Sequence, residues 1–372
     1  MIEIRELQFP RDAKKFVTYP FGLYRDNPYW VPPLISDEVA HLDARKNPVF
    51  QQVKARFIMA YRDGRPVGRM AGIINEVEVA QLGKPQLRFG WWDVEDDVAI
   101  TEAMLADIMA WGKAFGMTYI EGPMGFSNLD KVGVVTEGFD YRGSMITSYN
   151  HPYYVTHLEQ LGFRVEKRFR ECEFDIHSLQ TENFVRGQAL VKARYGVKPL
   201  NFKTTAELLP YVEQIFELFN EAYAVLPSFV PVQPDQIAYF KKKYIPLIKP
   251  DFIKMVLDAH DKPIAFSIVM PSFSDALQKS KGRLFPWGWY HFLQAKRQVD
   301  EVHFYLIGIA PEYQKKGVTA IIFDEYYKTF ARYGVTRFIR TPELENNVAI
   351  DLIWKHFGSI FKRWRCTYTK PL

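Results

Sequence analysis

The sequence predicts a mixed α/β fold made of two halves that share one order of elements. The chain has 372 residues, which is more than a typical single domain needs. Strand-like runs with alternating apolar residues are interspersed with helix-like runs, which favours α/β elements around a mixed sheet. The order hairpin, strand, helix, strand, helix, strand occurs twice. We therefore expect two domains, residues 1–180 and residues 181–372.

The internal repeat rests on three pairs of matching segments. Residues 57–74 and 252–270 each form two strand-like runs around a turn, in which Gly64-Arg65-Pro66 matches Asp261-Lys262-Pro263. Helix-like segments that end at Gly116 and Gly334 are each followed by a short strand. Residues 158–169 resemble residues 353–364. The spacing from the hairpin to the last segment is nearly equal in both halves, which indicates a repeated unit.

The first half follows this order from its N-terminus. We expect strands at 2–7, 57–62, 67–74, 87–92 and 117–123, and helices at 11–24, 34–43 and 98–115. Proline-containing breaks separate the first two helices. The second half is expected to contain a strand at 197–202, helices at 206–223 and 236–244, the hairpin at 252–270, a strand at 301–309 and a helix after residue 319.

Two irregular stretches are candidates for substrate contacts. Residues 122–154 are dense in Gly, Ser, Asn and Tyr, and long loops of this kind often carry function. Their polar candidates are Asn128, Asp130, Glu137, Tyr149, Asn150 and His151. An Ω-like loop packed on its own aromatic residues is the alternative. In the insertion at 272–300, the aromatic residues could line a substrate pocket, form a lid, or belong to a helix that caps the core: Phe285, Trp287, Trp289, Tyr290 and Phe292.

The segment 301–319 carries the strongest functional signal. A strand ends in Ile307-Gly308-Ile309, a turn follows at Pro311, and Gln314-Lys315-Lys316-Gly317-Val318-Thr319 leads into a helical pattern. Free backbone N–H groups and the positive end of a helix dipole favour an anion such as phosphate at this place. Lys315 and Lys316 add positive charge. A strand, a turn and a solvated basic loop without a ligand is the alternative.

This segment resembles motif A of the GNAT N-acyltransferase superfamily, whose loop reads Gln/Arg-x-x-Gly-x-Gly/Ala. Gln314, Lys315, Lys316, Gly317 and Val318 fit, and Thr319 departs at the last position. The resemblance implies that the loop amides hold the pyrophosphate of acetyl-CoA or another acyl-CoA. It also implies that the preceding strand, near Ile307, Gly308 and Ile309, holds the pantetheine and the acyl carbonyl.

The same resemblance suggests where catalytic groups could lie. Members of the superfamily often take a base from a carboxylate on this strand, and Glu301, His303 and Tyr305 alternate on one face by period two. The second family signature, Asn-x-x-Ala-x-x-Leu-Tyr, begins at Asn347, which would contact the cofactor. Trp354 stands where the acid tyrosine usually is, so Tyr305, Tyr326, Tyr327, water or no group would protonate the leaving thiolate.

The first half lacks an equivalent phosphate loop. Trp91-Trp92-Asp93-Val94-Glu95-Asp96-Asp97 contains four acidic residues and no glycine. Carboxylates at a helix N-terminus satisfy the helix dipole themselves and would repel a pyrophosphate. We therefore expect only the second half to bind the cofactor. Most of the chain is similar to bacterial tandem GNAT-like proteins, a group for which the resemblance brings a fold but no acceptor.

Composition narrows the function classes. The net charge is +5 and the pI about 8.9, with no recognised nucleic-acid motif, so nucleic acid is not expected as a partner. We expect an amine of a small molecule or peptide as substrate, no metal, no membrane and a cytoplasmic location, since Cys172 and Cys366 form no disulfide framework and no signal peptide is evident. The alternatives to an N-acyltransferase that transfers an acetyl or other acyl group are a Fem-like transferase that uses aminoacyl-tRNA and a non-catalytic acyl-CoA-binding protein.

Overall fold

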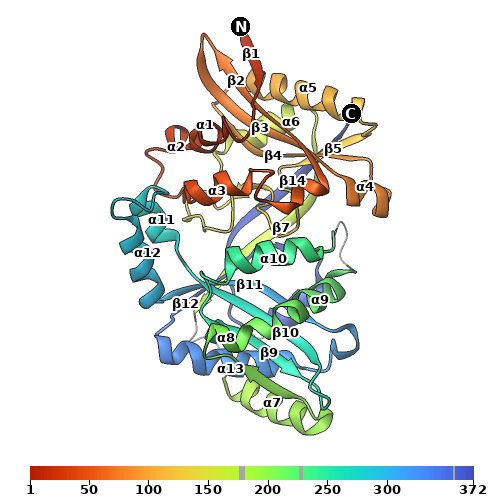
Figure 1. Ribbon diagram of the computed structural model, residues 1–372, viewed down its shortest axis with the longest axis vertical. Helices are drawn as coiled ribbons and strands as arrows, with labels where there is room; N and C mark the ends of the chain where they lie inside the picture. The colour runs from red at the N-terminus through yellow and green to blue at the C-terminus, as the bar shows by residue number, and fades with distance from the viewer. Residues whose placement is uncertain (176–180, 226–228, 355–356) are drawn as a thin grey trace. The chain divides into compact units, whose positions relative to one another are not determined.

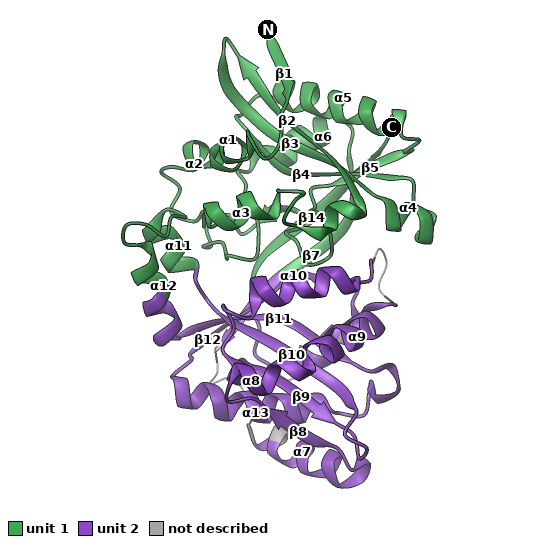
Figure 2. Ribbon diagram, in the orientation of Figure 1, with its two compact units in different colours: residues 1–170, 274–292, 362–372 green, residues 171–273, 293–361 purple. Residues whose placement is uncertain are grey.

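The chain forms two compact units (Figures 1 and 2). The structure is a computed structural model that describes residues 1–175, 181–225, 229–354 and 357–372. Unit 1 comprises Met1–Arg170, Ser274–Phe292 and Lys362–Leu372, and unit 2 comprises Glu171–Phe273 and Leu293–Phe361. Both termini therefore belong to unit 1, and the chain passes between the units four times. The domain division at residue 180 stays a prediction.

Unit 1 contains a mixed sheet with the strand order β1, β2, β3, β4, β5, β14. The bounds of these strands are Ile2–Glu6, Val53–Arg62, Arg65–Asn75, Gln86–Val94, Tyr119–Gly122 and Ile360–Pro371. Neighbouring strands are antiparallel except β4 and β5, which are parallel. A short strand, β6 (Val134–Glu137), also pairs with β14.

Small residues allow a helix to lie directly on this sheet. The helices of unit 1 are α1 (Ala13–Thr18), α2 (Pro20–Leu23), α3 (Ile35–His41), α4 (Glu76–Leu82), α5 (Val98–Ala114), α6 (Tyr153–Gln160) and α11 (Ser274–Ser280). A Cβ atom at Gly68 of β3 would lie 2.9 Å from Met104 Cε of α5, and one at Gly72 would lie 3.1 Å from Ile108 Cβ. Glycine at both positions therefore lets α5 bury its apolar side chains against β3.

Unit 2 repeats the pairing pattern of unit 1. Its strands follow the order β7, β12, β11, β10, β9, β8, and all neighbours are antiparallel except β11 and β12. Their bounds are Arg164–Asp175, Arg337–Arg340, Glu301–Ile309, Pro263–Pro271, Ile253–Leu257 and Lys198–Asn201, and β13 covers Glu343–Leu344. The division between the units falls within β7, whose residues up to Arg170 belong to unit 1, and within β14, whose first two residues belong to unit 2. The strand paired with β5 in unit 1, β14, and the strand paired with β12 in unit 2, β7, each come from a distant part of the chain. The predicted mixed α/β fold in two similar halves is confirmed.

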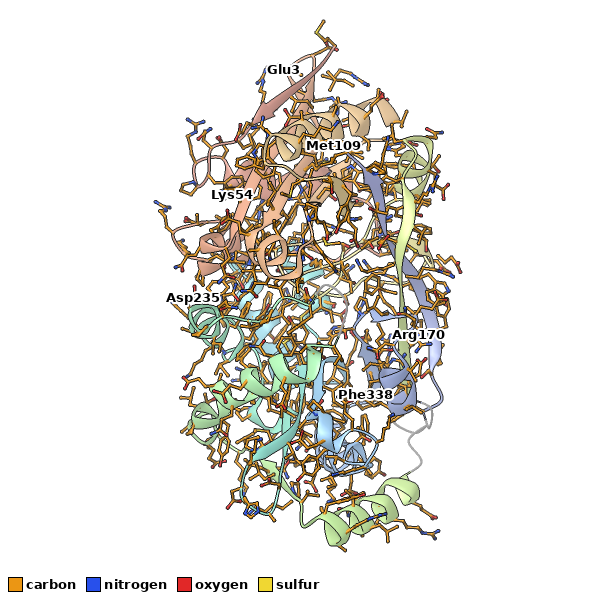
Figure 3. The ribbon with its side chains drawn as sticks, turned by 90° about the vertical axis from the view of Figure 1, so that its right-hand side faces the viewer. Glu3, Lys54, Met109, Arg170, Asp235 and Phe338 are labelled. Atoms are coloured by element: carbon orange, nitrogen blue, oxygen red, sulfur yellow. The ribbon has the colours of Figure 1, made fainter. Side chains whose placement is uncertain are left out.

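Aromatic side chains fill the core of unit 2. Phe304 of β11 contacts the rings of Phe323, Tyr326, Phe338 and Trp354, and Figure 3 labels Phe338 on β12. The helices of this unit are α7 (Thr181–Tyr195), α8 (Thr205–Leu208), α9 (Val212–Tyr223), α10 (Pro234–Tyr244), α13 (Thr319–Tyr333) and α14 (Val348–Trp354), and α12 (Gly288–Arg297) spans the boundary between the units. In the described ranges, no helix is both long and apolar enough to cross a bilayer.

Two expected helices are divided at a proline. The predicted helix 11–24 consists of α1 and α2, and α2 begins at Pro20. The predicted helix 206–223 consists of α8 and α9 with a 3-10 turn, Leu209–Tyr211, between them that contains Pro210. Proline lacks the N–H that would continue the helical ladder, so the single helices expected at these places were wrong. Helix α7 was not expected; it packs on α13, where a Cβ at Gly187 would lie 3.4 Å from Ala320 Cβ.

A buried lysine is the least usual charge in unit 2. Lys254 of β9 is 3% exposed, and its Nζ donates to Asn201 Oδ1 and Thr329 Oγ1 at 2.8 Å each. Burial lowers the pKa of Lys254 to about 8. Since its pKa in the unfolded chain is about 10.4, the unfolded chain binds more protons between these values. The stability of the protein should therefore rise with pH in this range.

The substitution Lys254→Met should remove this dependence. For the wild type, we expect this lysine to make the free energy of unfolding about 1 kcal/mol larger at pH 9 than at pH 7. Urea unfolding at the two pH values measures the difference. The exposed Lys203→Met serves as the control and should keep the wild-type slope. If the free energy of unfolding changed equally with pH in all three proteins, Lys254 would not be the cause of this dependence.

Candidate functional site

Strand β11 loses its pairing partner β12 halfway along its length, which leaves one edge of β11 open. Parallel pairing with β12 runs from Glu301, opposite Arg337, to Phe304, opposite Arg340. β11 then continues along β10 alone as far as Ile309. No strand within the described residues pairs with the other edge of residues 305–309. This stretch therefore presents backbone N–H and C=O groups to a ligand or to side chains.

A β-bulge marks the point where the two strands separate. Ile268 of β10 lies opposite Leu306, and the next residue, Val269, lies opposite Phe304, so Tyr305 has no opposite residue. A bulge bends its strand and increases the local twist. It also breaks the simple alternation expected for Glu301, His303 and Tyr305. The opening of the strand thus has a local structural cause.

Tyr223 of α9 reaches the open stretch. Its hydroxyl donates to the carbonyl of Ile307 at 3.1 Å. Burial raises the pKa of Tyr223 to about 12, so the hydroxyl keeps its proton at neutral pH. Sequence reasoning missed this residue, because it lies 84 positions away from Ile307 and no motif includes it.

The loop after β11 leaves several backbone donors available. Lys315 and Gly317 have positive φ angles of 66° and 77°. Within the described part of the chain, the N–H groups of Lys315, Gly317, Val318 and Thr319 meet no protein acceptor. These groups lie at the N-terminus of the 15-residue helix α13, whose dipole favours an anion. Alternating left-handed residues arrange successive N–H groups as an anion-binding concavity.

The loop is held in place by its own side chains. Gln314 Nε2 donates to the carbonyl of Ile309 at 3.3 Å, which ties the loop to the end of β11. Lys316 Nζ lies 4.5 Å from the ring centre of Tyr313 and 5.2 Å from that of Tyr195. Val318 is buried in the core, whereas Lys315 is exposed. Donors, positive charge and fixed backbone together fit a diphosphate group.

The three catalytic candidates lie at different places along β11. Glu301 is in the paired part of the strand and forms an ion pair with Arg337 at 2.8 Å. His303 is also in the paired part, fully buried, with Nε2 3.1 Å from Ser272 Oγ. Tyr305 lies at the bulge where the strands separate, and its hydroxyl is 3.4 Å from that of Tyr244. Only Tyr305 therefore lies at the open stretch; the catalytic roles stay predictions.

The residues of the second motif have structural contacts. Asn347 Oδ1 accepts from the N–H of Ile350 at 3.2 Å, which caps α14. Trp354 is 5% exposed and packs against Phe304, Phe323 and Phe357. A cofactor contact by Asn347 stays a prediction.

The other tyrosines named as proton donors differ in exposure. Tyr326 is buried, and its hydroxyl donates to the carbonyl of Phe252 at 3.0 Å. Tyr327, on the same helix, is partly exposed to solvent. Tyr326 is therefore part of the core, where its proton already has an acceptor.

The corresponding loop of unit 1 is occupied by carboxylates. β4 also has a bulge, near Trp91, which has a positive φ of 44°, and its pairing with β5 ends at Arg88. Asp97 Oδ1 accepts from the N–H of Ala99 at 2.9 Å and so caps α5. The ion pair with Arg62 is the main cause that lowers the pKa of Asp97. A carboxylate thus takes the place that an anionic ligand would need.

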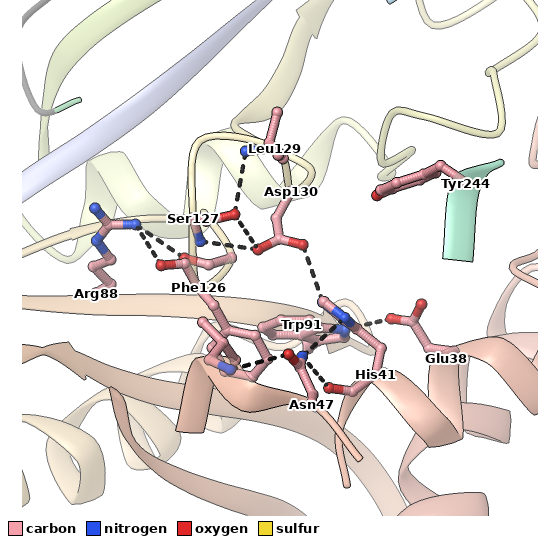
Figure 4. Close-up of polar contacts among 12 residues, drawn as sticks. Glu38, His41, Asn47, Arg88, Trp91, Phe126, Ser127, Leu129, Asp130 and Tyr244 are labelled. Carbon is pink, nitrogen blue, oxygen red and sulfur yellow. Dashed lines mark hydrogen bonds and ion pairs between the residues drawn. The ribbon is translucent and has the colours of Figure 1, made fainter. Parts of the chain in front are cut away.

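A buried histidine organises part of the 122–154 loop (Figure 4). Asn47 Oδ1 accepts from the N–H of Val49, which turns its amide nitrogen toward His41 Nδ1 at 3.1 Å. His41 Nδ1 is then the acceptor, and Nε2 donates to Asp130 Oδ1 at 3.0 Å. The other oxygen of Asp130 accepts from the N–H of Ser127 at 2.9 Å. Asp130, one of the predicted polar candidates, therefore fixes the loop to α3.

The remaining polar candidates of this loop divide into two groups. Asn150 bonds both backbone groups of Val135, and Tyr149 donates to the carbonyl of Phe139 at 2.9 Å, so these two hold the loop together. His151 stacks on Tyr24 with ring centres 4.9 Å apart. Asn128 and Glu137 are exposed. Most of the candidates thus contribute to a loop packed on itself, and their contact with a substrate stays a prediction.

The described residues contain no group of three or more His, Cys, Asp and Glu side chains that could hold a metal ion.

No family model matches the chain. It is 26% identical over 375 residues to "Protein YghO" of Escherichia coli (strain K12), covering 97% of this chain and 94% of that protein. It is 22% identical over 327 residues to "Bacterial ceramide synthase" of Caulobacter vibrioides, covering 84% of this chain and 82% of that protein.

The similarity to a solved structure extends over the whole chain. A tandem GNAT protein from the clavulanic acid biosynthesis pathway matches all of this chain and 98% of its own, with a TM-score of 0.59 and 11% identity. This likeness concerns the fold. Together with the two parallel strand pairs that open at a bulge, it shows that the chain has the tandem GNAT fold, as the sequence predicts.

Proposed function

We propose that the protein is an acyl-CoA-dependent N-acyltransferase whose unit 2 binds the cofactor. The observation that carries this proposal is the loop Lys315–Thr319, where four N–H groups without a protein acceptor adjoin the open stretch of β11. The tandem GNAT fold implies acyl-CoA binding in general. The relative named as a bacterial ceramide synthase supports an N-acyltransferase over a non-catalytic binding protein.

The proposal gives each segment of the site one task. The N–H groups of Lys315, Gly317, Val318 and Thr319 bind the diphosphate, with Gln314 and Lys316 holding the loop. The backbone of Ile307, Gly308 and Ile309 binds the pantetheine arm along the open edge, and Asn347 contributes a further cofactor contact. A bound acyl-CoA supplies the acyl group as a thioester.

The remaining tasks concern charge and protons. An N–H group on the open stretch of β11 stabilises the negative charge that develops on the acyl oxygen. Tyr305, at the bulge, is assigned to donate a proton to the leaving thiolate. Glu301 and His303 are the candidates for the base that removes a proton from the amine. Trp354 cannot donate a proton in a useful pH range, so Tyr305 is assigned this role in its place.

We propose a fatty acyl group, rather than acetyl, as the group transferred. The support is the relative named as a bacterial ceramide synthase, since a ceramide is an N-acylated long-chain amine. Unit 1 does not bind a second cofactor in this proposal, because Asp97 caps α5 and Glu95 pairs with Arg65 at its loop.

The cofactor site can be tested with two glycines of one helix. Gly317 precedes α13 with a φ of 77°, and Gly334 follows it with a φ of 71°. Gly317→Glu should weaken CoA binding at least about tenfold, because a carboxylate would face the diphosphate. Gly334→Glu has the same added charge and a similar backbone cost, and no atom lies within 4 Å of its Cβ position. Calorimetric titration with CoA measures both.

Equal affinities of the two Glu variants, or no CoA binding by the wild type at millimolar concentration, would contradict the proposed cofactor site. Thermal unfolding of each variant establishes that it folds. CoA binding without turnover over a broad panel of amines would contradict the enzymatic part alone.

A second test concerns Tyr223 as a positioning residue. Tyr223→Phe removes the hydroxyl that holds the Ile307 carbonyl, a contact of about 1 kcal/mol, so KM for acyl-CoA should rise about fivefold while kcat changes little. Tyr326→Phe removes a similar hydrogen bond, to Phe252, away from the open edge. Steady-state kinetics should show an unchanged KM for Tyr326→Phe. An equal rise of KM in both variants would indicate that the hydroxyl contributes to stability and does not position the Ile307 carbonyl.

The acyl chain is tested with a panel of acyl-CoAs from acetyl to palmitoyl. With a panel of amines that includes a long-chain amino alcohol, we expect kcat/KM to increase with chain length. Release of free CoA, followed with a thiol reagent, measures turnover. A preference for acetyl-CoA would contradict the fatty acyl assignment and leave the cofactor site untouched.

A further inference from the structure

The segment between α11 and α12 exposes an unusual number of large aromatic side chains. Phe285 and Trp287 are 79% and 72% exposed, and Trp289 and Tyr290 at the start of α12 are about half exposed. Single exposed apolar residues are ordinary, but four within six positions form a patch that marks an interaction surface. We call residues 281–290 the aromatic–basic segment.

This segment is presented from a fixed base within unit 1. Gln278 Nε2 of α11 donates to the carbonyls of Pro28 and Trp30 at 2.9 Å each. The N–H of Ile35 donates to the carbonyl of Gly282 at 2.9 Å. A Cβ atom at Gly282 would lie 2.3 Å from the Pro33 carbonyl oxygen, so glycine is needed for this contact. The exposed aromatic residues therefore do not belong to a loose loop that could fold back on the core.

Between Asp275 and Asp300, the charged residues of the sequence have one sign. Residues 276–299 contain five Lys or Arg residues and no Asp or Glu. Lys279, Lys281, Arg283 and Arg297 are exposed on both sides of the aromatic residues. Trp and Tyr next to cationic side chains are typical of protein segments that lie at the interface of an anionic bilayer. There the rings enter the headgroup layer while the cations meet the lipid phosphates.

We propose that the aromatic–basic segment docks the protein on the surface of an anionic lipid bilayer. This contact is peripheral, which agrees with the finding that no helix of the described residues is suited to cross a membrane. It departs from the expectation that no membrane is a partner. It also differs from the pocket, lid or core cap expected for these aromatic residues. The inference does not depend on the proposed acyl transfer.

Vesicle co-sedimentation of the full-length protein tests the proposal without any acyl-CoA. We expect binding to phosphatidylcholine vesicles that contain phosphatidylglycerol, little binding to pure phosphatidylcholine, and a decrease at high salt. The double variant Trp287→Ser/Trp289→Ser should bind at least about tenfold more weakly. Lys281→Gln/Arg283→Gln should lose about tenfold or more, at about 1 kcal/mol for each cation.

A matched control removes two exposed apolar side chains elsewhere. Phe115, directly after α5, and Leu190, on α7, are exposed, and Phe115→Ser/Leu190→Ser should bind vesicles as the wild type does. Thermal unfolding shows whether each variant is folded. Brominated lipids should quench the tryptophan fluorescence of the wild type and of the control more than that of Trp287→Ser/Trp289→Ser.

Several results would overturn the proposal. These are no binding of the wild type to anionic vesicles, equal binding to neutral vesicles, or wild-type binding by the aromatic double variant. Binding to an acidic polypeptide such as polyglutamate, with no binding to vesicles, would assign the segment to an acidic protein partner instead.

Discussion

The limited parallel pairing between β11 and β12 is the constraint on which the candidate site depends. The pairing ends at Phe304, while β10 pairs with β11 as far as Ile309. Backbone groups on the open edge must then find other partners. Tyr223 satisfies one of them, at Ile307, and Gln314 satisfies another, at Ile309. Both contacts leave N–H groups on the loop and strand for a ligand.

The same constraint operates in unit 1 with a different outcome. Pairing between β4 and β5 ends at Arg88, and a bulge near Trp91 follows. There the helix that follows begins at a carboxylate, Asp97, and not at a glycine-containing loop. The two loops therefore differ in backbone as well as in side chains: Lys315 and Gly317 have positive φ angles before α13, whereas Asp97 caps α5 in unit 1. This is the physical reason why only one of two similar loops is proposed to bind a cofactor.

Structural features that depend on residues close together in the chain are predicted well from the sequence. The strand at 301–309 has the predicted bounds, and the loop 314–319 lies where the motif indicates, because both follow from local patterns. The bulge at Tyr305 could not be predicted, since the partner strand determines it. Tyr223 and His41 were missed for the same reason, as their partners are far away in the chain. The helix divisions at Pro20 and Pro210 also depend on local sequence, since proline interrupts the helical hydrogen bonds.

The exposed aromatic residues of the segment 281–290 require a cause outside the fold. Burying one such side chain gains about 1.5–3 kcal/mol. The base of this segment is nevertheless fixed by Gln278 and Gly282, which hold the aromatic residues away from the core. An acceptor with a long apolar chain would be scarce in water and concentrated in a bilayer. A surface that holds the protein at the lipid would therefore bring it to such an amine, which connects the proposed docking of this segment with the proposed fatty acyl transfer.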